Sequence, residues 1–146
     1  MGINVLKGRK INVGPFTASE LEKSKIKCRT WKPIRPPFGD PFSDYIREAL
    51  IAELKNLGIF ALEATVLKIG NLDRIDFDSF PPAKWEIALT LRASSGKDMT
   101  RTFSYPYISA RGNLCCELTA QAFRPAVQEL LNSILQSPEF AELASE

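Results

Sequence analysis

One amphipathic stretch, residues 114–135, constrains the fold more than any other part of this 146-residue chain. Apolar and small side chains recur there at steps of three and four residues, which places them on one face of a helix. They are Cys116, Thr119, Phe123, Ala126, Val127, Leu130 and Ile134. Such a stripe has to be buried, and we expect strands between Ile59 and Ile108 to supply the matching apolar face. Pro125 predicts a kink, or a helix that restarts at Phe123.

A second helix is predicted from Asp40-Pro41 onward. Asp40 is a good N-cap residue, and proline is well tolerated at the first helical position. Gly58 stands where a left-handed C-terminal cap belongs. The apolar stripe between these signals consists of Phe42, Tyr45, Ile46, Ala49, Leu50, Leu54 and Leu57.

Alternating apolar and polar side chains predict the strands. They are expected within residues 11–16, 26–31, 59–69, 75–78, 85–91 and 100–107, with a hairpin turn at residues 94–97. Because one side of each strand is polar, helices can cover only one face of the sheet. The predicted fold class is therefore α+β, in two layers. An antiparallel sheet of four or five strands carries two long helices on one face. Residues 11–146 are expected to form this single domain, and residues 1–10 a flexible leader or tether remnant.

Four aromatic residues of the predicted sheet could be interpreted in two ways. Trp85, Phe103, Tyr105 and Tyr107 are similar to the base-stacking platforms of proteins that bind single-stranded RNA. However, they lie on the face that the helices must cover, so the sequence favours a hydrophobic core.

The chain contains no histidine. This excludes Ser-His-Asp and Cys-His triads and removes the commonest general base and metal ligand. Asp73, Asp76 and Asp78 form an acidic cluster, but the spacing of a calcium-binding EF-hand is missing, which favours a solvated segment. We therefore expect no enzyme activity, no cofactor and no metal site.

Charge is unevenly distributed. Residues 1–40 hold nine Lys or Arg against three Asp or Glu, a net charge of +6, and the remainder holds ten against fourteen, a net charge of −4. A basic end favours an anionic partner such as lipid headgroups or nucleic acid. A solvated basic edge without a partner is the alternative.

The three cysteines lack the spacing of a zinc site or a redox pair. Adjacent cysteines bridge each other poorly, so in an oxidising compartment a long-range disulfide would join Cys28 to Cys116 or Cys115. Helical spacing from Phe123 favours Cys116. Three reduced thiols, two of them in the core, are the alternative.

The proline-rich segment 31–38 is the predicted partner-binding site. Prolines 33, 36 and 37 predict an extended loop. It carries apolar and basic side chains that suit contact with a partner or a membrane surface: Trp31, Lys32, Arg35 and Phe38. Packing of Trp31 and Phe38 onto the core is the alternative.

Four segments resemble the YajG-like lipoproteins of the Gram-negative envelope and, more loosely, auxiliary lipoproteins of ABC transport systems. They read DPFSDYIREALIAELKNLGIF, KWEIALTLRASSGKDMTRTFSYPY, AQAFRPAVQELLNSIL and SPEFAEL. The resemblance implies a non-enzymatic periplasmic domain, tethered to the outer membrane by a lipidated N-terminal cysteine. No such cysteine and no signal peptide precede the domain here, so we expect that the anchor was removed before Met1.

The resulting functional hypothesis is an envelope domain that binds a protein or lipid partner, with no nucleic acid expected. Two alternatives remain. One is a cytosolic nucleic-acid-binding or adaptor module that uses the basic N-terminal part, and its binding would weaken steeply with salt. The other is an enzyme that uses carboxylates and arginine in a deep pocket.

Overall fold

The computed structural model describes residues 10–19, 26–28, 32–34, 36, 41–64, 69–78, 82–108 and 114–144. The predicted leader lies outside these residues except for Lys10. Ile11 and Val13 are both buried, so the segment that they belong to is part of the packed core. Arg47 holds this segment in place, since its guanidinium donates hydrogen bonds to the carbonyl oxygens of Gly14 (2.7 Å) and Val13 (3.0 Å).

The main sheet has four strands in the order β1-β4-β5-β6. They are β1 (Phe16–Ala18), β4 (Ile69–Asp78), β5 (Ala83–Arg92) and β6 (Asp98–Tyr107). β4, β5 and β6 are antiparallel neighbours, whereas β1 runs parallel to β4. The α+β class is confirmed, but the sheet is mixed rather than purely antiparallel. A parallel pair joins segments far apart in sequence, so local alternation could not predict it.

The predicted strand over residues 59–69 is largely wrong. In the described part, Phe60 makes a single parallel bridge with Ile11, and residues 62–63 form a turn. The strand starts at Ile69. Gly70 is paired within β4, and the irregularity of this strand falls between Leu72 and Arg74, where a β-bulge shifts the register.

Helix α2 spans Phe42–Asn56. Its N-cap position is occupied by Pro41, without a side-chain cap hydrogen bond, so the prediction of Asp40 as N-cap and Pro41 as the first helical residue is off by one position. Asp40 itself lies outside the described residues. The C-terminal prediction is confirmed, because Gly58 adopts a φ of 73° immediately after the last turn.

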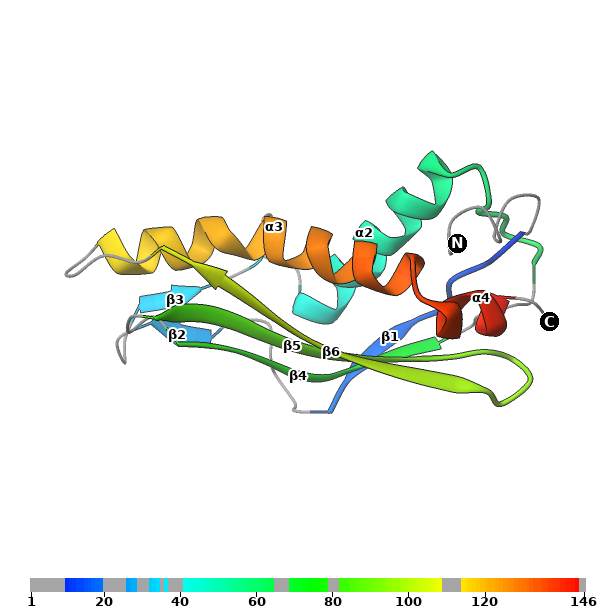
Figure 1. The fold of residues 1–146 in the computed structure, drawn as a ribbon, viewed down its shortest axis with the longest axis horizontal. Helices are drawn as coiled ribbons and strands as arrows, with labels where there is room; N and C mark the ends of the chain where they lie inside the picture. The colour runs from blue at the N-terminus through cyan, green and yellow to red at the C-terminus, as the bar shows by residue number, and fades with distance from the viewer. Residues whose placement is uncertain are drawn as a thin grey trace.

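Helix α3 spans Leu114–Leu135 and contains Pro125, and α4 spans Pro138–Ala144. The helix is continuous through Pro125, so it does not restart at Phe123. All seven residues of its predicted stripe are buried. Figure 1 shows α2 and α3 on one side of the sheet and α4 near the β5–β6 hairpin. At 15 and 22 residues, α2 and α3 differ clearly in length.

The core lies between the sheet and the two long helices and is centred on aromatic rings. Trp85 of β5 has no exposed surface, and its ring centroid lies 5.2 Å from that of Phe123 and 6.3 Å from that of Phe42. Its indole Nε1 donates a hydrogen bond to the carbonyl oxygen of Thr119 in α3 (2.9 Å). The interpretation of this sheet face as core, rather than as a base-stacking platform, is supported by this burial.

Two further short strands form a separate sheet. β2 (Ile26–Cys28) and β3 (Lys32–Ile34) pair antiparallel, with Ile26 opposite Ile34 and Cys28 opposite Lys32. Residues 32–34, predicted as part of an extended loop, are therefore a strand. Ile34 is buried, and β3 contacts α3.

Candidate partner-binding surface

The sequence-predicted partner site falls mostly outside the described residues. Trp31, Arg35 and Phe38 lie there, and Lys32 is described only as backbone at the start of β3. The structure does show the backbone that lies between Trp31 and Arg35. This strand, β3, pairs with β2 and contacts α3. The expectation that these four side chains contact a partner stays a prediction.

The two adjacent cysteines are both buried at the start of α3. Cys115 is a fully buried thiol. Cys116, the next residue, is 3% exposed. Cys28 lies on β2, but its side chain is outside the described residues. The pairing of Cys28 with Cys116 therefore stays a prediction.

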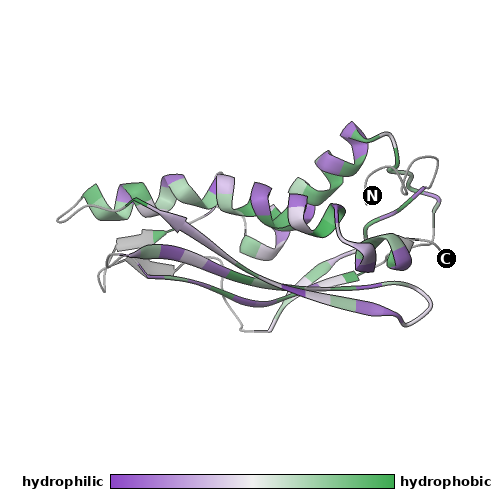
Figure 2. Cartoon of the chain, in the orientation of Figure 1, coloured by the Kyte–Doolittle hydropathy of each residue, from purple (hydrophilic) through white to green (hydrophobic). Residues whose placement is uncertain are grey.

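Large apolar side chains are exposed where β6 ends and α3 begins. Ile108 follows β6 directly and is 88% exposed, and Leu114 opens α3 and is 52% exposed. Tyr105 and Tyr107 of β6 are partly buried against the core. We call Tyr105, Tyr107, Ile108 and Leu114 the apolar end. Figure 1 shows this end of α3 beside the C-terminus of β6 and on the side of the molecule that holds β2 and β3, and Figure 2 shows the first turn of α3 as hydrophobic.

A buried polar cluster fixes the geometry of the apolar end. The Tyr107 hydroxyl and the Thr119 hydroxyl are 2.5 Å apart, and the Thr119 hydroxyl also donates to the carbonyl oxygen of Cys115 (2.8 Å). Burial raises the pKa of Tyr107 above its usual value, although the hydrogen bond with Thr119 opposes this shift. Cys115 and Asp78 raise the same pKa further. The cluster thus ties the end of β6 to the first turns of α3.

The open face of the sheet carries a network of polar side chains around the bulge. Asp73 accepts hydrogen bonds from the Asn71 amide (2.7 Å) and from the Thr90 hydroxyl (2.5 Å), and Thr90 and Thr100 lie 2.7 Å apart. Asn71 also accepts a hydrogen bond from Thr17 of β1 (2.7 Å). A shallow groove of about 530 Å³ lies over this network. Its polar groups bond mainly to one another, which is typical of a solvated sheet face.

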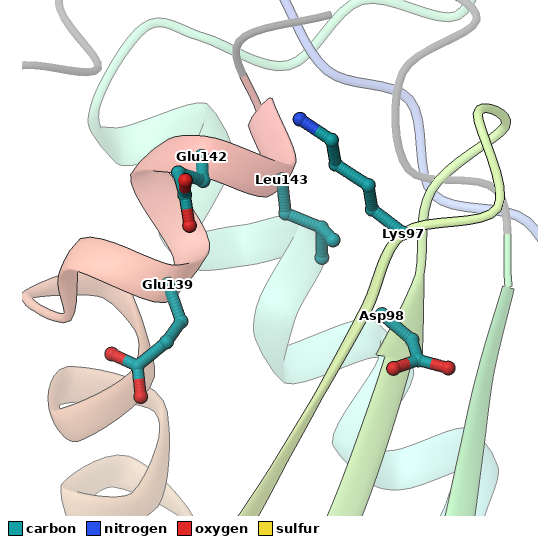
Figure 3. A pocket seen from close by; sticks show the side chains of 5 residues that line it. All are labelled: Lys97, Asp98, Glu139, Glu142 and Leu143. Carbon is teal, nitrogen blue, oxygen red and sulfur yellow. The ribbon is translucent and has the colours of Figure 1, made fainter.

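A second hollow, of about 250 Å³, lies between the β5–β6 hairpin and α4. Figure 3 shows Lys97 and Asp98 on the hairpin facing Glu139, Glu142 and Leu143 on α4. On the covered face of β6, Arg101 forms an ion pair with Glu139 at 3.7 Å. The hollow is small and its walls are charged, so it suits water better than an apolar ligand.

The predicted acidic cluster is dispersed along β4. Asp73 belongs to the open-face network, Asp76 lies 3.8 Å from Arg74, and Asp78 is at the strand end. Within the described ranges, no group of three or more His, Cys, Asp or Glu side chains is placed to hold a metal ion. In the same part of the chain, no helix is long and apolar enough to cross a membrane.

Comparison with known proteins establishes the fold alone. No protein-family model and no curated protein match the chain. Among solved structures, the chain is similar to protein XCC0632 from Xanthomonas campestris, of the family DUF330. The TM-score is 0.63 at 14% identity, over 92% of this chain and 85% of that one. A second structure, of an uncharacterized protein, is 11% identical over 84% of this chain and 91% of that one, with a TM-score of 0.45.

Sequence reasoning missed Ile108 and Leu114 as surface residues. Neither fits the buried pattern of the element it adjoins: Ile108 continues the outward-facing, even-numbered positions of β6, and Leu114 precedes the buried stripe of α3. Their position next to residues 109–113 was the available signal, because chain ends of elements are often exposed.

Proposed function

We propose that this protein is a non-enzymatic domain of the Gram-negative cell envelope, similar to the YajG-like lipoproteins, that binds a protein or lipid partner through its apolar end. In its full-length form it is periplasmic and held at the outer membrane by a lipidated cysteine. The observation that carries partner binding is the exposure of two large apolar side chains, Ile108 and Leu114, where β6 ends and α3 begins.

The apolar end suits binding because it is both apolar and fixed. Covering apolar surface favours a complex because it removes that surface from water. The Tyr107 hydroxyl is hydrogen-bonded to the Thr119 hydroxyl. The residue directly before Ile108 is therefore fixed against α3. Leu114 lies five residues before Thr119 on the same helix, about 7.5 Å along its axis. A pre-ordered surface loses little conformational entropy when it binds.

A non-enzymatic role is supported by how the described polar groups are used. Around the open-face groove, the hydroxyl, amide and carboxylate groups bond to each other, and Arg92 pairs with Asp98 at 3.3 Å. These pairs hold the sheet face in one arrangement. Catalytic sites more often present a carboxylate or hydroxyl toward an enclosed space with an altered pKa.

The envelope location is supported by the resemblance of the sequence elements and by the cysteines. We infer a disulfide between Cys28 of β2 and Cys116 of α3, which would fix the β2–β3 sheet to the helix that β3 contacts. Disulfides persist in the bacterial periplasm and are rare in the reducing cytosol. The fold likeness to XCC0632 is consistent with this proposal.

The binding proposal is tested with the double substitution I108S/L114S. Both side chains are exposed, so the fold should be preserved while the apolar end loses its contact surface. Flotation with vesicles of phosphatidylethanolamine and phosphatidylglycerol measures lipid binding. A photo-crosslinking residue at position 108, introduced in Gram-negative cells, captures a protein partner that mass spectrometry then identifies.

L62S is the matched control, because Leu62 is 76% exposed on a different segment. We expect vesicle binding, or binding of the identified purified partner, to be lost in I108S/L114S and kept in L62S. Equal binding by both variants would contradict the assignment of the site. An absence of binding in both the vesicle and the cellular experiments would contradict partner binding itself.

The location is tested by the intact mass of the protein isolated from its native host, before and after reduction. Acyl chains on the isolated protein, together with a mass gain of two hydrogens on reduction, are expected for a disulfide-bonded lipoprotein. An unmodified cytosolic protein, with no mass change on reduction, would overturn the envelope proposal.

A further inference from the structure

The two edges of the main sheet are protected very differently. At one edge, β1 has three residues and pairs with residues 70–72 of β4, so it covers part of that strand. At the other, β6 has ten residues, and of the described strands only β5 pairs with it. Figure 1 shows β6 along the whole border of the sheet, from the hairpin to the first part of α3. Long edge strands can pair with another chain.

The hairpin geometry shows which backbone groups of β6 face outward. The Ala93 N–H donates to the Lys97 carbonyl at the turn (2.8 Å), and hydrogen-bonded pairs then alternate along an antiparallel ladder. The odd-numbered residues Met99 to Tyr107 therefore direct their N–H and C=O groups toward β5. The even-numbered residues direct theirs to the free edge. Pro106, which has no N–H, is one of these even-numbered residues.

We infer that β6 pairs antiparallel with β6 of a second copy of this chain, across a twofold axis at Thr102, to form a continuous eight-stranded sheet. In this register Thr102 lies opposite itself, Thr100 opposite Ser104 of the second copy, and Asp98 opposite its Pro106. The missing N–H of Pro106 then falls at the outermost pair, where it costs the ladder least. This inference does not rest on the envelope location, and it shares only β6 residues, Tyr105 among them, with the apolar end.

The side chains of β6 are complementary to themselves in this register. On the open face, Thr–Thr and Thr–Ser pairs are favourable across antiparallel strands. On the helix-covered face, Arg101 lies opposite Phe103 of the second copy, a cation–π pair, and Met99 lies opposite its Tyr105, a sulfur–aromatic pair. Moving the axis by one residue to Arg101 would place two arginines opposite each other, which is unfavourable.

Sedimentation equilibrium from micromolar to millimolar protein concentration measures self-association. We expect the native protein to dimerise. T102P removes an outward N–H from the central pair without removing any hydrogen bond to β5, so dimerisation should weaken about tenfold or more. T102V retains the N–H and is the control. A native protein that stays monomeric throughout, or a T102P variant that dimerises as well as T102V, would overturn the inference.

Cysteine cross-linking tests the register separately. Opposed residues of a hydrogen-bonded pair have Cα atoms about 5.5 Å apart, which a disulfide can span. Oxidised T102C should form a covalent dimer in high yield, whereas T100C should not, because its opposite residue is Ser104. Native protein treated identically accounts for the natural cysteines. Equal cross-linking of T100C and T102C would contradict the twofold axis at Thr102.

Discussion

The two faces of the β4–β5–β6 sheet are built from the same strands but are stabilised in different ways. On the covered face, Trp85 packs among Phe42, Phe77 and Phe123 with ring centroids 5.1–6.3 Å apart. On the open face, Arg74 lies 3.1 Å from Glu86, and both remain partly exposed. Burial of large aromatic surfaces contributes far more to stability than exposed ion pairs do. One face therefore determines whether the domain folds, and the other is free to vary.

The largest effect is expected for W85A. Removing the indole leaves a cavity at the centre of the core and the Thr119 carbonyl without its donor. We expect the free energy of unfolding to fall by about 3–5 kcal/mol. Urea denaturation followed by circular dichroism measures it. K84A, on the open face of the same strand, is the control. If K84A lowers the free energy of unfolding as much as W85A does, the two faces do not differ in their contribution to stability.

G70A tests the covered face where β1 joins the sheet. A Cβ atom at this position would lie 2.6 Å from the Phe16 ring, so the ring has to move. We expect a loss of about 1–3 kcal/mol from overpacking, measured by chemical denaturation. The double variant F16L/G70A should regain part of this loss. If G70A alone is neutral, the ring is not held against β4 as the structure places it.

Y107F probes the polar cluster at the border of the covered face. At neutral pH we expect a loss of about 1 kcal/mol, from the hydrogen bond with Thr119. The pKa of Tyr107 is raised in the folded protein, so its neutral form is favoured there. The stability it contributes is complete below the unfolded pKa, near 10, and is lost as the pH rises toward the folded pKa.

The pH dependence gives Y107F a second measurement. Denaturation curves recorded at increasing alkaline pH should show a steeper loss of stability for the native protein than for Y107F. Y105F, one alternate position earlier on the same face, is the control. Parallel curves for the native protein and Y107F would contradict a raised pKa for Tyr107.

The smallest effect is expected for R74A. Its guanidinium contacts Glu86 and Asp76, but the side chain is 55% exposed, so water and salt screen both pairs. We expect a change within about 0.5 kcal/mol by thermal and urea denaturation. A loss above about 1 kcal/mol would show that the open face is also a source of stability.

Sequence alone predicted those parts of the fold whose signals are local. The stripe of α3, the positive φ at Gly58 and the alternation around Trp85 each depend on neighbouring residues, and each is found in the structure. The segment after Ile59 failed because it alternates like a strand, yet Leu62 is left largely exposed. Burial there depends on where Ile11 docks, which lies far away in sequence.

The candidate site was less predictable for a related reason. Ile108 and Leu114 stand at the ends of strongly patterned elements but outside the buried pattern of each, and a pattern search for core residues passes over them. The edge position of β6 likewise follows from strand order, which no local pattern contains. The sequence did contain the aromatic side chains of β6, but their interpretation required the helix layer.

The close approach of Phe16 to Gly70 has a consequence for how the N-terminal segment finds its place. β1 has three residues, too few for its backbone hydrogen bonds alone to select one alignment against a ten-residue strand. Gly70 is the one glycine in β4, so an aromatic ring can lie flat against that strand at a single point. Sliding β1 by two residues would bring the ring onto the side chain of Leu72. The glycine therefore selects the register of the parallel pair.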